Sequence, residues 1–154
     1  MSEKISNVRN ISARIKGFVK ENGANNLSYL TYASKDNIEK YCDGGRMSIK
    51  TIKTMADIMG VSVAETMLEP GLEKNVEWYR DANEKYFSEN LRALAKDAGL
   101  SQVEISNLTG IHKNTINHYF KGKLYPRSNI MQLIADVIDV EVADFFVPFG
   151  GSER

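Results

Sequence analysis

The sequence has little of several residue types: one cysteine, two histidines and three prolines among 154 residues. Its single cysteine, Cys42, excludes an intrachain disulfide and a zinc site built on cysteines, which fits a reducing, cytoplasmic setting. No stretch of about 18 apolar residues is present, so we expect no membrane-spanning helix. Residues 1–10 are charged where a signal peptide is apolar, and secretion is not expected either.

Net charge is also lacking, because 20 Lys and Arg side chains balance 20 Asp and Glu side chains. The overall charge therefore gives no attraction for nucleic acid, and any attraction must be local. Residues 112–127 contain four basic side chains and no acid, whereas residues 136–144 contain four acids. The second half of the chain thus has one basic region that can face phosphate groups.

Motifs typical of enzymes are missing as well. The sequence has no glycine-rich phosphate loop and no nucleophile elbow, and His112 and His118 do not share a helical face. The many carboxylates fall on expected outer helix faces, where solvation explains them. We therefore expect no enzyme activity, no cofactor and no metal.

The sequence does have helical periodicity, with apolar residues at intervals of three and four along most of the chain. This pattern predicts an all-α fold. Pro70 and Gly71 interrupt it and indicate a domain boundary. We expect a first domain at residues 1–70, a helical linker at 71–86, a second domain at 87–149 and a flexible tail at 150–154.

The second domain is expected to contain five short helices. Ser88 is the expected cap of the first helix, which ends at Gly99. Ser101 and Glu104 predict a capping box at the start of the second helix, whose buried side would include Leu108. The second helix is therefore very short.

A tight turn is expected to follow at Gly110. The third helix would begin at His112 or Lys113 and stop at Gly122, so it carries the basic region. The fourth helix follows Pro126, and an apolar segment around residues 142–146 would form the fifth.

The residues that define the central motif are Gly99, Leu100, Ser101, Gln102, Ile105, Ser106, Gly110, Ile111, Thr115, Ile116, Gly122 and Pro126. Their order and spacing resemble the helix-turn-helix of the Cro and phage-repressor family, also called the xenobiotic-response-element family. Two short helices that cross at about 90–120° need a small residue, a turn glycine and an apolar plug. Ser106, Gly110 and Ile116 meet these needs. The resemblance implies a lambda-repressor-like domain of five helices.

The resemblance also implies that the second helix of the pair lies in the major groove of DNA. The residues expected to read bases are Lys113, Asn114, Thr115, Asn117 and His118. Lys can donate to guanine, Asn can pair with adenine, and Thr can contact a thymine methyl group. The residues expected to contact the DNA backbone are Gln102, His112, Lys121, Lys123, Tyr125 and Arg127. Simple solvent exposure is the alternative for His118, and packing on the domain is the alternative for Tyr125.

The first half of the chain carries a degenerate copy of the same pattern, because residues 34–44 align with 112–122 and residues 52–67 with 131–146. We therefore expect two tandem helix-turn-helix domains. Upstream of this alignment, ANNLS stands where the second half has LSQVEIS, which indicates a motif two residues shorter. Tyr32 also replaces the turn glycine, Gly110. The expected recognition helix of this copy mixes lysines with acids such as Asp36 and Glu39, so we expect weak or absent base reading there.

The leading hypothesis is a transcriptional repressor of phage or mobile-element type that binds double-stranded DNA. Because one recognition helix covers few base pairs, a second one is needed, from a homodimer or from the other repeat. The unequal copies favour a homodimer, and the apolar run at residues 145–149 is a candidate dimer face, with closure of the domain core as the alternative.

The second hypothesis is an inhibitor or antitoxin. In this case the first domain binds a protein partner, and the second domain binds DNA only for autoregulation. Tyr29, Tyr32 and Tyr41 are the candidate contacts, with packing inside the first domain as the alternative.

Overall fold

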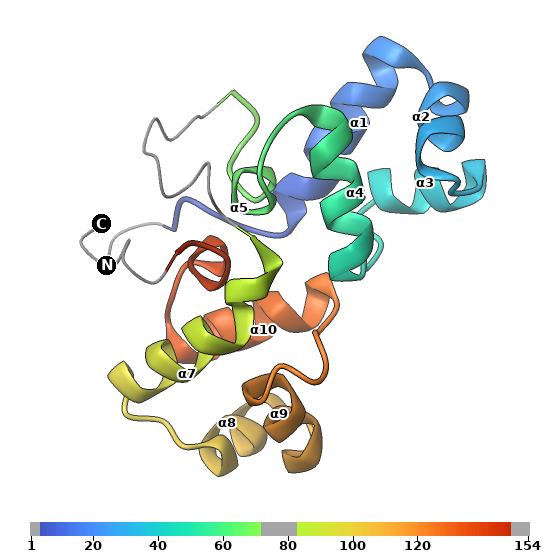
Figure 1. The fold of residues 1–154 in the computed structure, drawn as a ribbon. Helices are drawn as coiled ribbons and strands as arrows, with labels where there is room; N and C mark the ends of the chain where they lie inside the picture. The colour runs from blue at the N-terminus through green and yellow to red at the C-terminus, as the bar shows by residue number, and fades with distance from the viewer. Residues whose placement is uncertain (1–3, 72–82, 149–154) are drawn as a thin grey trace.

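The computed structural model describes residues 4–71 and 83–148, and within these ranges its regular structure is helical apart from one isolated bridge between Ser6 and Leu68 (Figure 1). The all-α prediction is therefore confirmed. None of the described helices is long and apolar enough to cross a bilayer. Most of the expected helical linker, residues 72–82, and the expected tail lie outside the described residues.

The first repeat consists of α1 (Arg9–Asn22), α2 (Ala24–Thr31), α3 (Lys35–Cys42), α4 (Ile49–Met59) and α5 (Val63–Thr66). The second repeat consists of η1 (Glu84–Tyr86), α7 (Phe87–Asp97), α8 (Gln102–Thr109), α9 (Lys113–Phe120), α10 (Ser128–Ile138) and η2 (Val142–Phe145). The five helices of the first repeat correspond in order to α7, α8, α9, α10 and η2. The last of these, the expected fifth helix, is a 3₁₀ helix.

The two repeats also share the ends of their helices. Gly60 after α4 and Asp139 after α10 both adopt the left-handed conformation. In each repeat the next residue, Val61 or Val140, returns its N–H to an alanine carbonyl inside the helix. This is the Schellman pattern, which ends a helix by satisfying its last carbonyl groups. The duplication seen in the sequence is thus present in the backbone.

The expected cap at Ser88 is wrong, because η1 runs directly into α7 and Ser88 lies inside the helix. The start of this helical segment is capped by Asn83 instead, whose Oδ1 accepts the Lys85 N–H at 3.1 Å. Ser88 packs beside Gly122, where a Cβ would lie 3.0 Å from the serine Oγ. The small side chain at position 88 therefore serves close packing rather than capping.

The apolar run near the C-terminus packs in the core, which is the alternative that the sequence left open beside a dimer face. Phe145, Phe146 and Val147 are all buried, and Phe149 lies outside the described residues. The ring of Phe87 contacts the ring of Phe145 at a centroid distance of 5.2 Å and that of Phe146 at 5.9 Å. These aromatic contacts attach the end of the second repeat to its first helix.

Leu108 also departs from expectation, because 60% of its surface is exposed. Ile105 is the one fully buried residue of α8. With eight residues, α8 is too short to present a wide apolar stripe. Leu108, three residues after Ile105, therefore lies outside the narrow part of α8 that packs against the domain.

Candidate nucleic-acid interface

The first helix of the motif, α8, starts with the expected capping box. Ser101 Oγ accepts the Glu104 N–H at 3.1 Å, and a carboxylate oxygen of Glu104 accepts the Ser101 N–H at the same distance. Together these bonds satisfy two backbone donors that have no partner within the helix. The start of α8 is therefore fixed, as the sequence predicted.

The turn between α8 and α9 is held by side chains as well as by its glycine. Gly110 adopts the left-handed conformation with φ 78°. The Ser106 hydroxyl donates to the carbonyl of Ile111, so this serine is more than a small residue at the crossing. Thr109 Oγ1 donates to the Ile105 carbonyl at 2.7 Å and accepts the Ile111 N–H at 3.2 Å. The angle between the two helices is thus fixed by hydrogen bonds across the turn.

The second helix, α9, has one buried and one exposed face. Ile116, Tyr119 and Phe120 are buried, and burial raises the pKa of the Tyr119 phenol. The guanidinium of Arg92 on α7 donates to the carbonyl of Phe120 and so holds the end of α9 against the domain. The helix can therefore offer its polar face as a rigid surface.

The expected base-reading residues lie on or beside this polar face. Lys113, Asn114 and His118 are exposed, while Thr115 and Asn117 are half-buried. The first turn of α9, where Lys113 and Asn114 lie, is the part of a recognition helix that reaches base edges. The structure therefore brings the expected set together on one element.

Two of the expected residues contact each other. Asn117 Nδ2 donates to Gln102 Oε1 at 3.1 Å, which ties the start of α8 to the middle of α9. The amide NH₂ of Gln102 stays available to donate to a phosphate oxygen. The hydrogen bond therefore fixes these two side chains relative to each other.

The expected backbone contacts surround α9. His112 precedes the helix and accepts the Asn114 N–H on its Nδ1 at 3.1 Å, so it is also the cap of α9. Lys121, Lys123 and Arg127 are exposed. These cations lie just after the helix, where they can contact phosphates on either side of a groove.

Tyr125 packs on the domain while its side chain stays partly exposed. Its ring makes an edge contact with Phe87 at 5.9 Å between centroids. This is the packing alternative that the sequence left open.

Two further residues of α8, Val103 and Asn107, were missed by sequence reasoning. They line a hollow of about 410 Å³ in front of the turn, together with His112 and Lys113. Both are exposed although they belong to the helix that was expected only to support α9. Their spacing of one helical turn was the available signal, because it places them on one face.

The first repeat builds the same turn, which corrects its description as a shortened motif. α2 has eight residues, like α8, and ANNLSYLT aligns with QVEISNLT without a gap. Ser28 donates to the Ala33 carbonyl as Ser106 does to Ile111. Thr31 Oγ1 donates to the Leu27 carbonyl at 2.8 Å. The hydrogen-bond pattern of the turn is therefore the same in both repeats, whereas the capping box of α8 has no counterpart at Gly23 before α2.

Together, the fold and the site define a helix-turn-helix DNA-binding unit in the second half of the chain. Residues 91–145 match the protein-family model described as Helix-turn-helix. This segment is a member of the Cro and phage-repressor type of that family, as its resemblance implied. The match supports a DNA-binding regulator in general. No curated protein and no solved structure matches the chain.

Proposed function

We propose that the protein is a sequence-specific transcriptional repressor of phage or mobile-element type, which acts in the cytoplasm by binding operator DNA. The observation that carries this proposal is the first turn of α9, where Lys113 and Asn114 are exposed on a helix whose opposite face is buried. Asn can pair bidentately with adenine and Lys can donate to guanine, so this surface can distinguish bases. Bound over a promoter, the protein would exclude RNA polymerase.

The selection of binding sites from random duplex DNA tests this proposal. We expect a short motif whose strongest positions depend on Asn114. The variant Asn114→Ala should lose preference at one base position by about 1–3 kcal/mol and keep its affinity for other positions. Selection of no sequence by the intact protein would contradict the proposal.

A second variant distinguishes contacts with the DNA backbone from contacts with bases. Lys123→Ala should weaken binding to all sequences alike and reduce the slope of log affinity against log salt by about one. Lys20→Ala is a matched control, because Lys20 is an exposed lysine at the end of α1. If the two lysine variants have the same affinity for DNA and the same salt dependence, Lys123 does not contact the DNA backbone.

A second candidate function is capture of a protein partner by the first repeat, as in an inhibitor or antitoxin. It is favoured by the exposure of Tyr29 and Tyr32, which reaches 79% and 96%. Tyr41, in contrast, packs partly against the core. Three results together would support this function: a protein partner binds in a one-to-one ratio, the variant Tyr29→Ala no longer binds it, and its binding changes the affinity for DNA. Regulation by the purified protein alone would count against it.

Other expectations from the sequence stay predictions. The homodimer is one of them, but its candidate interface around residues 145–147 is buried in the core. The domain limits at residues 1–70 and 87–149 are likewise a proposal, which limited proteolysis of the intact chain can test.

A further inference from the structure

The two repeats meet through equivalent elements. The last helix of the first repeat, α5, contacts the last turn of the second repeat, η2. One buried apolar cluster runs through both, from Ile11 to Val147. Contact between like elements is what a two-fold axis produces in a symmetric dimer.

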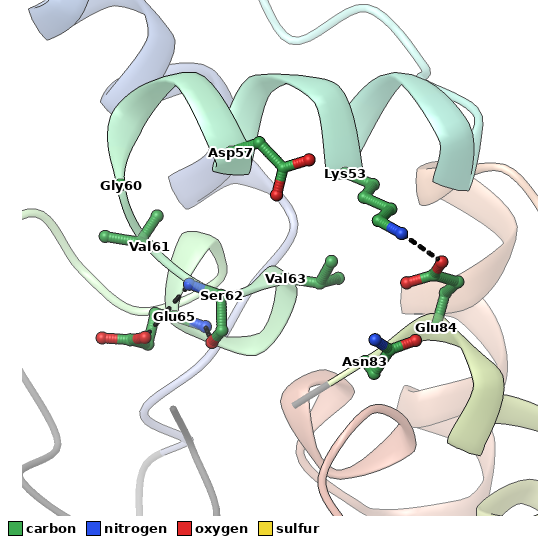
Figure 2. A pocket seen from close by; sticks show the side chains of 9 residues that line it. All are labelled: Lys53, Asp57, Gly60, Val61, Ser62, Val63, Glu65, Asn83 and Glu84. Carbon is green, nitrogen blue, oxygen red and sulfur yellow. Dashed lines mark hydrogen bonds and ion pairs between the residues drawn. The ribbon is translucent and has the colours of Figure 1, made fainter. Parts of the chain in front are cut away.

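Reciprocal contacts support the same symmetry. Lys53 and Gln132 are the fifth residues of α4 and α10. The Lys53 ammonium lies 3.0 Å from Glu84 Oε1, just before α7, and Figure 2 shows the two side chains facing each other. Gln132 Oε1 accepts the N–H of Val8, just before α1, at 2.9 Å. Each repeat thus uses the same helix position to hold the entry to the other repeat's first helix.

A second group of junction residues lies near the ends of these helices. Glu141 Oε1 accepts the N–H groups of Ile5 and Ser6 at 2.9 and 2.6 Å, and Lys4 lies 3.4 Å from Asp136. On the other side, the corresponding positions Asp57 and Ser62 border a hollow of about 420 Å³ with Asn83 and Glu84, drawn in Figure 2. The equivalent positions of the two repeats therefore lie at the junction on both sides, with hydrogen bonds and an ion pair on one side and a hollow on the other.

In a two-fold arrangement, a position of one unit contacts a second position of the other unit, and the reverse contact is also made. The contacts of Lys53 and Gln132 follow this rule. The operation that relates the repeats then also relates α3 to α9. As seen from α5 in Figure 1, α3 lies beyond α4 and α9 lies beyond α10. Each of these two helices thus lies on the far side of its own repeat from the contact of α5 with η2.

The surface between them is basic. Lys40, Arg46 and Arg127 line a hollow of about 490 Å³ together with a single acid, Asp43. Lys40 belongs to α3, whereas Arg127 caps α10, so the hollow spans both repeats. The repeats are joined beside it, because Met47 N–H donates to Ser128 Oγ at 2.9 Å and Ser128 N–H donates to the Met47 carbonyl at 2.8 Å. Phosphates between two half-sites would find paired cations here.

We propose that one chain is a complete two-headed DNA-binding unit, in which α3 enters a second major groove and the protein binds as a monomer to an operator with two unlike half-sites. This rests on the proposed DNA-binding function of α9. Helix-turn-helix dimers bind half-sites about one helical turn apart, and the junction supplies that pairing within the chain. The contact of α5 with η2 thus brings the two motifs together within one chain.

The chemistry of α3 predicts what its half-site contains. Lys35 stands where Lys113 stands in α9, while Asp36 replaces Asn114 and Glu39 replaces Asn117. All three side chains of α3 are exposed. Carboxylates accept from the amino group of cytosine, so α3 selects cytosine where α9 selects adenine. Its acids weaken binding on their own, but the rigid attachment to α9 raises the effective concentration of DNA at α3.

The test combines site selection with stoichiometry on the full chain. We expect two unlike half-sites about one turn apart and one chain per duplex by light scattering of the complex. The double variant Asp36→Ala, Glu39→Ala should lose about tenfold in its preference for cytosine at the α3 half-site and leave the α9 half-site unchanged. Glu21→Ala is the control, because it removes an exposed acid of the same repeat outside α3.

The possible outcomes separate this inference from the proposed function. A palindromic site that binds two chains overturns the inference, and so does a single half-site that is insensitive to the α3 variant. In both cases the function of α9 stands. If the intact protein selects no sequence, the proposed function fails and the inference fails with it. Circular dichroism of the surface variants confirms that each one is folded.

Discussion

The two helix-turn-helix motifs of this chain have the same interior and different surfaces. Ser28 and Ser106 hold equivalent carbonyl groups across their turns, and Ile38 and Ile116 fill equivalent buried positions. On the outside, the first motif carries acids and tyrosines where the second carries amides and a glycine. A few interior groups therefore fix the geometry of the motif, and the exposed face is free to take on another recognition chemistry.

The largest expected effect tests whether the two interiors are equivalent. Ile38 and Ile116 are 0% and 1% exposed. Replacing either one by Ala should lower the free energy of unfolding by about 2–5 kcal/mol, because each leaves a cavity between the helices of its motif. Chemical denaturation of the two variants measures this. A cost below about 1 kcal/mol for Ile38→Ala alone would show that the first motif is loosely packed.

Sequence reasoning located the second motif because its signals are local. The capping box of Ser101 and the turn at Gly110 involve neighbours in sequence, and both are confirmed. The sequence predicts a shortened first motif because ANNLS stands where the second half has LSQVEIS. Gly23 provides no side-chain cap that would indicate where α2 begins. Local patterns therefore predicted the motif where its caps are conventional and misread it where they are not.

The junction between the repeats could not be predicted in this way. Glu141 binds residues at the other end of the chain, and no periodicity connects them. The same reason explains the run Phe145, Phe146 and Val147, whose apolar character fits a dimer face or a core equally well. Tertiary contacts decided between these alternatives, and the sequence contains no signal for them.

A smaller effect is expected at this junction. Glu141 accepts three hydrogen bonds, from the Ile5 and Ser6 N–H groups and the Ser6 hydroxyl. Glu141→Ala leaves the buried Ser6 donors without their acceptor and should cost about 1–3 kcal/mol. Glu141→Gln keeps an acceptor oxygen and should cost less. Thermal denaturation compares them, and equal costs for the two variants would mean that these hydrogen bonds do not hold the repeats together.

The smallest effect concerns the left-handed position of the turn, which is Tyr32 in the first motif and Gly110 in the second. Tyr32 and Gly110 are both left-handed, with φ 60° and 78°. A side chain with a Cβ costs about 1–2 kcal/mol in this conformation, whereas glycine adopts it freely. Tyr32→Gly should therefore stabilise the protein by about 0.5–1 kcal/mol, after the greater freedom of glycine in the unfolded chain is subtracted.

Gly110→Ala is the opposite change and should destabilise by about 1 kcal/mol. No atom lies within 4 Å of a Cβ built at Gly110, so this cost is purely conformational. If Tyr32→Gly is neutral or destabilising, the exposed tyrosine ring contributes contacts that offset the strain. The turns would then differ in energetics as well as in sequence. If both changes have the expected signs, the first motif keeps a strained tyrosine at a position where folding favours glycine.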